Sequence, residues 1–311
     1  MEMDTSIKKL QVLLQAIDAG TLTATAERTG YTQSGITHMM RALEEELGLP
    51  LLQRGRNGVE TTSVCRELLP YMRALLAANE RFCQEVSAIQ GLDAGTILIG
   101  ANASISMYWL PTIIERFEYE YPNIKIKLFG GESDHALELL KQGSVDVCFL
   151  SARPENTDWV HLCYDPYLVL LPAAHPLANG AAFPVEALTG QDFLRYGTID
   201  SKDLAEVETL LAAREIQPNV KYVSNSDYAI ASMVEHGLGI SILPELILSG
   251  FPQRVVKQPL APAVSRDLGI AVRSIQDAAP AVRRLIRCAK QTIEEGAVYL
   301  PGKGAYLFDR G

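Results

Sequence analysis

The sequence of 311 residues predicts an α/β protein in three parts: a small, mainly helical domain, one long helix, and a larger domain built around a β-sheet. Three observations support this prediction. Short helical patterns separated by single glycines occupy residues 1–62. Apolar residues at alternating steps of four and three run through residues 63–90. From 91 to 295 strand-like runs alternate with helix-like runs, as in α/β sheets, and residues 296–311 show no clear pattern.

Two short helices are predicted at the start of the chain. The first carries an apolar stripe of Ile7, Leu10, Leu14 and Ile17. Gly20 is placed to end it, because glycine readily adopts the left-handed conformation that closes a helix. The second starts at Thr23 and stops near Gly30, and a further helix follows directly. Two helices joined by a few residues around a glycine indicate a helix-turn-helix.

The helix that follows Gly30 has two different faces. Its apolar stripe is Ile36, Met40, Leu43 and Leu47. The opposite face carries hydroxyl, imidazole and guanidinium groups, which are able to reach base edges when a helix lies in a major groove. We predict DNA contacts from this face and from the helix start, where Thr32 is a good N-cap: Thr32, Gln33, Ser34, Thr37, His38 and Arg41. Taken alone, the pattern fits an ordinary amphipathic surface helix equally well.

A β-hairpin is predicted next, in the position of a wing. Two short apolar runs from 51 to 59 flank Asn57-Gly58, a pair that favours a tight turn because both residues tolerate positive φ. Arg54 and Arg56 stand near its tip with no acidic residue between them. The hairpin is therefore able to place cations on DNA phosphates or in a narrow minor groove. The alternative is a pair of solvated surface arginines.

At this point the sequence resembles the LysR-type transcriptional regulators, and the resemblance extends over nearly the whole chain. It is carried by these ordered motifs: Ala24-Thr25-Ala26-Glu27-Arg28, Thr32-Gln33-Ser34-Gly35-Ile36-Thr37, Arg41-Ala42-Leu43-Glu44, Glu46-Leu47-Gly48, Leu52-Gln53-Arg54 and Val59-Glu60-Thr61-Thr62. Gly35, Met39 and Cys65 depart from the family pattern, and a glycine in the helix should weaken it by about 1 kcal/mol. The resemblance implies a sequence-specific DNA-binding regulator with a winged helix-turn-helix domain over 1–62.

One long helix is predicted over 63–90. Its seam, typical of paired helices, consists of Leu68, Met72, Leu75, Asn79, Phe82, Val86 and Ile89. Asn79 is a polar interruption of the kind that sets register, and Pro70 should kink the helix or mark the end of its first turns. The alternative is that the seam packs against the chain's own domains. The resemblance implies a dimerisation helix, and hence a homodimer or homotetramer on double-stranded DNA with a dyad operator.

The region from 91 to 295 reads as an α/β domain. Strands are expected over 96–100, 124–129, 145–150, 167–171, 220–223, 239–243 and 268–272. Helices are expected over 109–119, 135–142, 204–214, 228–236 and 281–294. The resemblance implies an effector-binding domain of the periplasmic-binding-protein type (type 2), with subdomain I at about 91–165 and 266–295 and subdomain II at about 166–265. The chain would cross near Asp165-Pro166 and return near Pro262.

Polar side chains at strand-to-helix junctions are the candidate effector ligands. In such sheets ligands bind at the carboxyl ends of strands, where helix N-termini offer free N–H groups. We predict Asn102, Ser104, Ser133 and Asn225, with Thr198 as a weaker candidate. Ordinary N-capping explains each residue equally well. Because helix N-termini favour anions, the expected effector is a small anionic metabolite.

Composition limits the other possibilities. The formal charge is −9, and residues 1–90 hold nine Lys and Arg against eleven Asp and Glu, so DNA binding has to rest on the local placement of cations. The five cysteines are widely spread and contain no C-x-x-C pair, which is typical of a reduced, cytoplasmic protein. A redox pair of Cys148 with Cys163 is the alternative, although Cys148 lies in an apolar run.

Enzymatic and membrane functions are not indicated. The sequence contains no G-x-S-x-G elbow, no P-loop, no G-x-G-x-x-G that opens a helix and no histidine pair at metal-ligand spacing, so we expect no catalytic residues, no metal and no cofactor. No apolar run approaches membrane-spanning length, and we expect no membrane partner. A small-molecule solute-binding protein without a DNA function is the second hypothesis, but it would leave the first 90 residues without a role.

Overall fold

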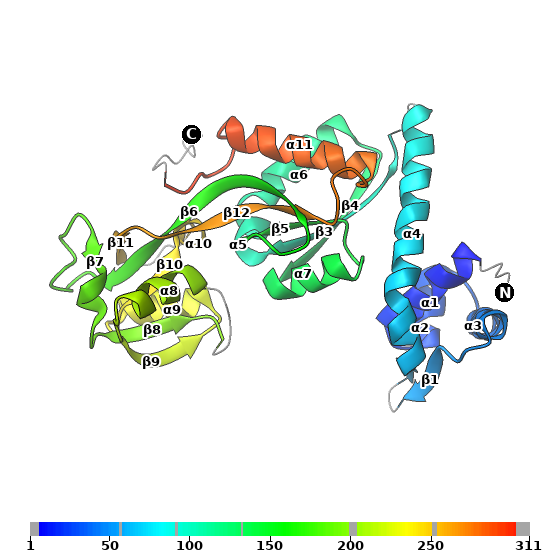
Figure 1. Ribbon diagram of the computed structural model, residues 1–311, viewed down its shortest axis with the longest axis horizontal. Helices are drawn as coiled ribbons and strands as arrows, with labels where there is room; N and C mark the ends of the chain where they lie inside the picture. The colour runs from blue at the N-terminus through cyan, green and yellow to red at the C-terminus, as the bar shows by residue number, and fades with distance from the viewer. Residues whose placement is uncertain are drawn as a thin grey trace.

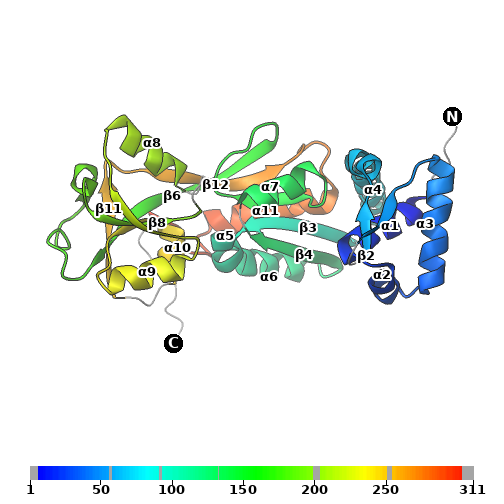
Figure 2. The ribbon, with the colours of Figure 1, turned by 90° about the horizontal axis from the view of Figure 1, so that it is seen from below.

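The computed structural model describes residues 6–55, 58–90, 93–131, 133–198, 204–250 and 254–302. The molecule is elongated: the N-terminal domain lies at one end, the long helix α4 (Ser63–Ile89) stands beside it, and a sheet-containing body extends away from that helix (Figure 1). Seen from below, α3 (Gln33–Leu47) forms the far edge of the N-terminal domain (Figure 2). The predicted α/β class and three-part organisation are confirmed.

The N-terminal domain has the predicted helices and hairpin. Its elements are α1 (Ile7–Ala19), α2 (Leu22–Thr29), α3 (Gln33–Leu47), β1 (Leu52–Gly55) and β2 (Gly58–Thr61). Gly20 and Gly30 end α1 and α2 with φ of 70° and 73°, which confirms both predicted stops. The hairpin is attached to the first of these turns, because the Val59 N–H donates to the Gly20 carbonyl at 2.9 Å. Asn57 of the predicted Asn57-Gly58 turn lies outside the described residues, as does the neighbouring Arg56.

Helix α4 has the predicted length and runs without interruption through Pro70, so the helix does not end there. Its first half completes the core of the N-terminal domain. Cys65 and Met72 are buried there, and Leu68 packs against the same cluster, which also contains Leu13 and Ile36. The second half leaves this core and approaches the larger domain.

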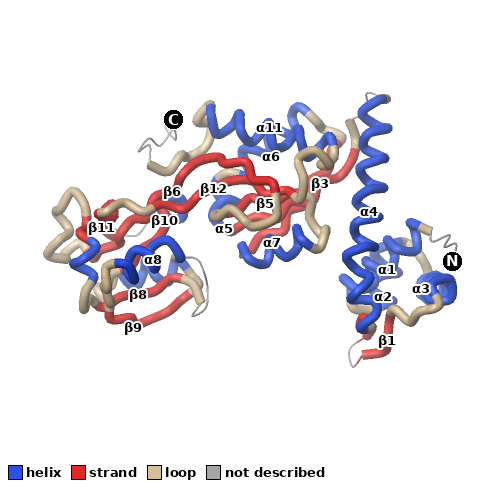
Figure 3. The backbone as a smooth tube through the Cα atoms, viewed as in Figure 1, coloured by secondary structure: helices blue, strands red, loops and turns tan. Residues whose placement is uncertain are grey.

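Subdomain I is a sheet with helices on both faces. Its strands include β3 (Gly95–Asn102), β4 (Ile124–Gly131) and β5 (Val147–Leu150), which are parallel with β3 in the centre, and β12 (Ser265–Val272), antiparallel to β5. The helices are α5 (Ala103–Tyr108), α6 (Leu110–Glu120), α7 (Ser133–Lys141) and α11 (Pro280–Glu294). Helices α6 and α11 cover one face and α7 covers the other (Figures 1 and 3). Strand residues consequently alternate between two cores: Val147 and Phe149 face α6 and α11, and Cys148 faces α7.

Subdomain II is smaller and contains a second parallel strand pair. Its elements are β7 (Phe183–Pro184), η1 (Val185–Leu188), β8 (Asp192–Tyr196), α8 (Ala205–Ala213), β9 (Asn219–Ser224), α9 (Asp227–Glu235), β10 (Ser241–Pro244), α10 (Glu245–Leu248) and β11 (Val255–Ala261). Strands β8 and β9 are parallel, so their carboxyl ends lie at the same edge. The core around Tyr167, Phe183 and Phe193 is separate from that of subdomain I.

The two subdomains are joined by one long strand, β6 (Asp158–Pro172). Its first part pairs with β12 and its second part with β10 and β11. The expected strand over 167–171 is therefore only the end of a strand of 15 residues. The first part escaped prediction because polar residues such as His161 interrupt its pattern. Strands β8 and β11 were also not predicted.

Candidate functional site

The polar face of α3 is open to solvent. The apolar stripe is buried as predicted, with Ile36 and Leu43 fully covered. On the opposite face Thr37 is half-buried, and the other predicted contact residues are exposed: Thr32, Gln33, Ser34, His38 and Arg41. Because residues 34, 37, 38 and 41 are spaced by three and four, they occupy one face of the helix. This face presents hydroxyl, imidazole and guanidinium groups together.

The start of α3 is held by its own N-cap. The Thr32 hydroxyl accepts a hydrogen bond from the Gly35 N–H at 3.1 Å and lies 3.2 Å from the Ser34 hydroxyl. A Cβ on residue 35 would lie 3.2 Å from the Thr32 hydroxyl oxygen, which is tight. Gly35 therefore gives the capping side chain room, which partly offsets its lower helix propensity.

Two of the acidic residues of α3 are engaged by neighbouring groups. A carboxylate oxygen of Glu44 accepts hydrogen bonds from the N–H groups of Leu51 and Leu52 at 2.7 and 3.0 Å. Glu46 forms an ion pair with Lys9. The third acidic residue, Glu45, is exposed one turn after Arg41 on the same face, so the cationic and neutral groups are confined to the part of the face between Ser34 and Arg41. Of the predicted wing cations, Arg56 and the side chain of Arg54 lie outside the described residues.

The predicted seam of α4 is divided between two environments. Leu68 and Met72 belong to the core of the N-terminal domain, because α4 crosses α1 there. Asn79 is half-buried. The remaining seam residues are exposed apolar side chains, with exposed fractions of 53% for Leu75, 67% for Phe82, 37% for Val86 and 85% for Ile89. The alternative that the seam packs on the chain's own domain therefore holds for its first two residues only.

The predicted effector residues fall at strand ends in two groups. Asn102 and Ser104 follow β3, and Ser133 follows β4, whose Gly131 pairs with Asn102. Thr198 and Asn225 follow β8 and β9, whose last residues Tyr196 and Ser224 are paired. Each subdomain thus contributes one cluster, and each cluster lies at the carboxyl edge of parallel strands, where ligands bind in such sheets.

Within the first cluster, Asn102 and Ser104 are turned inward and are buried. The Asn102 side-chain oxygen caps α5 by accepting from the Ile105 N–H at 3.0 Å, and it also accepts from the Ser104 hydroxyl at 3.3 Å. These contacts fit the N-cap alternative. Ser133 is half-buried, and its hydroxyl lies 3.3 Å from that of Ser151. Ser151 follows β5 at the same edge and was not predicted.

The second cluster is open to solvent. Thr198 and Asn225 are both exposed. The Thr198 carbonyl accepts a hydrogen bond from Arg195, which is itself paired with Glu208 at 2.6 Å. The N-cap of α9 is the neighbouring Ser226, whose hydroxyl accepts from the Ala229 N–H. The side chain of Asn225 is therefore not needed for capping.

A buried ion pair, Arg266 with Asp165, lies beside the first cluster, and sequence reasoning missed it. The Arg266 guanidinium donates to Asp165 at 2.8 Å and to the Ser104 hydroxyl at 3.0 Å. Asp165 is fully buried and also accepts from the Leu246 N–H of α10 at 2.9 Å. Burial raises the pKa of Asp165, and the charge of Arg266 opposes this effect. The only sequence signal was an arginine near the start of strand β12, which is apolar from Leu268 onward.

Two family models match the chain. The model described as LysR substrate binding domain matches residues 90–294, and the model described as bacterial regulatory helix-turn-helix protein, lysR family, matches residues 7–66. The chain belongs to the LysR family. This LysR-type protein is a DNA-binding transcriptional regulator with an effector-binding domain, and not an enzyme.

Relatives and solved structures agree with this assignment. The LysR-type regulator is 30% identical to the HTH-type transcriptional regulator YvbU of Bacillus subtilis, covering 92% of this chain and 98% of YvbU. It is 29% identical to the probable regulator LrrA of Synechococcus elongatus, over 93% and 98% of the two chains. A full-length OxyR variant from Pseudomonas aeruginosa shares the fold, with a TM-score of 0.72, 21% identity and coverage of 94% and 96%. Full-length CbnR in complex with its target DNA has a TM-score of 0.64 at 20% identity, with coverage of 93% and 100%.

The described residues of this LysR-type regulator indicate neither a membrane span nor a metal centre. No helix among them is both long and apolar enough to span a membrane. They also contain no group of three or more His, Cys, Asp or Glu residues arranged to hold a metal ion.

The buried Cys148 and the exposed Cys83 should differ in reactivity. Cys148 is buried and burial raises its pKa to about 12, whereas Cys83 is exposed on α4. Since the thiolate is the reactive form, brief iodoacetamide treatment at pH 7.5 should alkylate Cys83 and leave Cys148 intact, as read by peptide mass spectrometry. Alkylation of Cys148 at the rate of Cys83 in the native protein would contradict this prediction. It would favour the alternative that Cys148 forms a redox pair with Cys163.

Proposed function

We propose that this LysR-type regulator recognises a dyad-symmetric operator by placing α3 of each subunit in a major groove. The observation that carries the proposal is the exposed polar face of α3, formed by Ser34, His38 and Arg41 with the half-buried Thr37. Side chains of these types read base edges, and the N–H groups at the start of α3 favour a nearby phosphate. Arg54 and Arg56 of the hairpin would contact the flanking backbone or minor groove. The protein would act in the cytoplasm, where its DNA lies.

Selection of genomic fragments by the purified full-length protein tests the DNA proposal. We expect a small set of fragments that share an imperfect dyad and whose binding retains a preference over random DNA across a salt series. Weak binding of all fragments that disappears at modest salt would contradict sequence-specific recognition by the protein without effector.

We further propose that the exposed part of the α4 seam forms the subunit interface. Leu75, Phe82, Val86 and Ile89 would leave a row of apolar side chains in water in a monomer, and a second α4 would cover them. Two-fold pairing of α4 would also place two copies of α3 on one DNA dyad. A homodimer is the minimal assembly, and a homotetramer satisfies the same contacts.

Asn79→Leu tests this interface. We expect a higher melting temperature and a loss of oligomer specificity, because an apolar residue would complete the seam while the polar register signal would be lost. Melting curves and light scattering after size exclusion provide the measurements, with the exposed Glu67→Leu as a control on the same helix. An unchanged melting temperature together with an unchanged mass would argue against pairing through this seam.

For the effector we propose a small anionic metabolite that binds between the two strand-end clusters. Ser133, Thr198 and Asn225 would offer hydroxyl and amide groups, while Asn102 and Ser104 would position Arg266 beneath them. In the described part of the chain the second terminal nitrogen of Arg266 has no hydrogen-bond partner, and 8% of the side chain is exposed. Binding alters DNA recognition only if the effector favours one arrangement of the subunits.

A thermal-shift panel tests the chemical class of effector. Small carboxylic acids and their neutral amides would be compared at equal concentration with the full-length protein. We expect stabilisation by one or more acids and none by the matching amide, because only the anion gains from the helix N-termini and Arg266. Stabilisation by neutral compounds alone would overturn the anionic assignment.

A further inference from the structure

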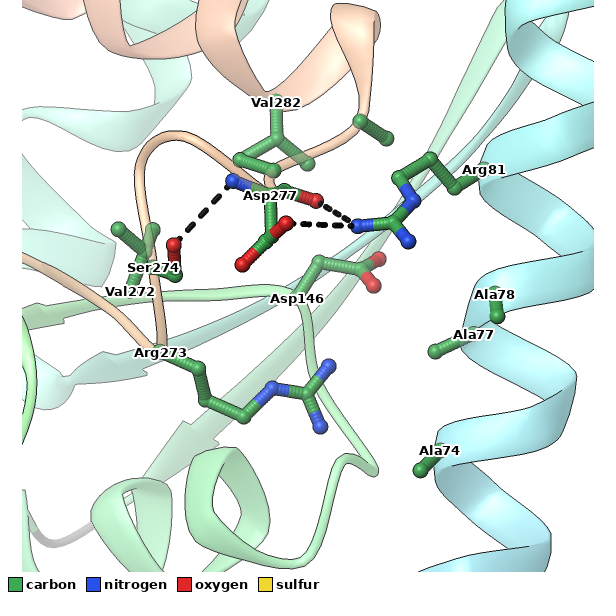
Figure 4. A pocket seen from close by; sticks show the side chains of 12 residues that line it. Ala74, Ala77, Ala78, Arg81, Asp146, Val272, Arg273, Ser274, Asp277 and Val282 are labelled. Carbon is green, nitrogen blue, oxygen red and sulfur yellow. Dashed lines mark hydrogen bonds and ion pairs between the residues drawn. The ribbon is translucent and has the colours of Figure 1, made fainter.

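A groove of about 470 Å³ separates α4 from subdomain I and is distinct from the strand-end clusters (Figure 4). Its α4 wall consists of Ala74, Ala77 and Ala78, whose small side chains leave the space open. The opposite wall is formed by the turn before β5, the end of β12 and the start of α11. This groove lies at the joint through which the effector-binding domain is connected to the DNA-binding domain.

Two arginines face this groove from different elements. Arg81 of α4 is held in place, because its guanidinium donates to the Asp277 carbonyl at 2.7 Å and pairs with the Asp277 carboxylate at 3.5 Å. Arg273 follows β12, and its guanidinium lies against Gly143 so closely that a Cβ there would clash with it. Nevertheless, Arg273 forms no hydrogen bond or ion pair within the described part of the chain.

An acidic residue, Asp146, faces the same space. One carboxylate oxygen accepts from the Leu98 N–H at 2.8 Å, and the other has no hydrogen-bond partner among the described residues. Burial raises the pKa of Asp146, and the nearby charge of Arg273 opposes this effect. The two side chains do not form an ion pair, although both face the groove. The Asp146 carboxylate and the Arg273 guanidinium are therefore both able to form further hydrogen bonds to a bound group.

We propose that the groove binds a small zwitterion of the α-amino acid class. The ligand carboxylate would pair with the Arg273 guanidinium, assisted by Arg81, and the ligand ammonium would pair with Asp146. Among the residues that line the groove, the four charged side chains Arg81, Arg273, Asp146 and Asp277 sum to zero, and Glu80 adds a further negative charge near Asp146, so the site complements a neutral zwitterion better than a phosphate or a dicarboxylate. The alanine wall would contact the ligand side chain.

Such a ligand would link α4, and with it the DNA-binding domain, to subdomain I. In the structure α4 is attached to subdomain I by polar contacts: the Gln84 amide donates to the Thr96 carbonyl at 3.0 Å, and Glu80 accepts from the Thr96 N–H at 3.2 Å. Arg73, which precedes the alanine wall on α4, donates to Gln142 at 2.9 Å. A ligand bound between these contacts would add bridges from α4 to subdomain I and would hold the DNA-binding domain in one orientation.

Titration calorimetry on the full-length protein tests this proposal with the individual standard L-amino acids as probes. We expect saturable binding of at least one, weakened about tenfold or more by Arg273→Gln and by Asp146→Asn. Arg254→Gln, an exposed arginine of subdomain II, and Ser133→Ala of the first strand-end cluster should leave the affinity unchanged. The decarboxylated amine and the deaminated acid of the bound amino acid should each bind at least about tenfold more weakly.

Three outcomes would overturn the proposal. The first is the absence of saturable binding for every amino acid. The second is loss of affinity in Ser133→Ala with unchanged affinity in the folded groove variants. That result would mean that the amino acid binds at the strand-end clusters and not in the groove. The third is equal binding of the deaminated acid, which would remove the role of Asp146. Melting curves of each variant establish that it is folded, and Arg273→Lys provides a second variant that retains the positive charge.

Discussion

Arg266→Met should lower the free energy of unfolding of the effector-binding domain by about 3–5 kcal/mol, the cost of leaving a buried charge without its partner. Asp165 is fully buried, and after the change it would keep only the Leu246 N–H. For a domain of this size the melting temperature should fall by on the order of 10 °C. Calorimetric melting curves of the full-length protein at pH 8 provide the measurement.

The pH dependence of this variant has a defined sign. Burial already raises the pKa of Asp165, and loss of Arg266 would raise it further. When folding raises the pKa of a carboxyl, its contribution to the free energy of unfolding is fully present below the pKa of the unfolded chain. That contribution is lost as the pH rises through the pKa of the folded state. The deficit of Arg266→Met should therefore be larger at pH 8 than at pH 5.

Two further variants test the interpretation of the buried pair. Arg254→Met removes an exposed arginine and should change the free energy of unfolding by less than about 0.5 kcal/mol. The double variant Arg266→Met with Asp165→Asn should recover part of the loss, because it no longer buries an unpaired charge. A decrease of less than about 1 kcal/mol in the free energy of unfolding for Arg266→Met alone would show that water reaches Asp165 and that the pair does not hold the subdomains together.

Arg41→Ala should weaken binding to the selected operator by about 1–3 kcal/mol, or roughly tenfold to a hundredfold, while binding to random DNA changes little. Arg41 is exposed on the face of α3 that carries Ser34, Thr37 and His38, and no described residue binds its guanidinium. It is therefore free to form a bidentate contact with a guanine. Fluorescence anisotropy with operator and scrambled duplexes at two salt concentrations provides the measurement.

Two controls separate base recognition from simple charge. Arg153→Ala removes an exposed arginine of the effector-binding domain and should leave both affinities unchanged. Arg41→Lys retains the charge but not the planar fork, so it should lose specificity more than total affinity. Equal losses on operator and scrambled DNA for Arg41→Ala would assign the residue to a phosphate contact.

The N-terminal third of the protein was predictable because its signals act over a few residues. Thr32 caps α3 at its start and Gly30 ends α2 in the left-handed conformation, as their residue types indicate. The bounds of α4 also followed from its repeat. These signals depend on backbone hydrogen bonding and helical spacing, both of which can be read locally.

The effector region was predicted only in outline. Strand-end positions such as Ser133 and Asn225 were found because parallel strands share an edge. Whether a residue at such an edge faces inward was not predictable: Asn102 and Ser104 are buried, and Ser104 accepts from Arg266, 162 positions away. No local pattern reports a contact between residues so distant in the chain.

By itself, the sequence determined the family, the order of the domains, the helix that presents Arg41 and the length of α4, because periodicity, capping residues and ordered motifs are properties of neighbouring residues. Only the tertiary structure decided that Met72 packs in the core of the N-terminal domain while Phe82 is exposed. It also decided that Asp165 meets Arg266 at the junction of the subdomains. Burial and long-range pairing arise from how complete elements pack, so they become visible only after the chain has folded.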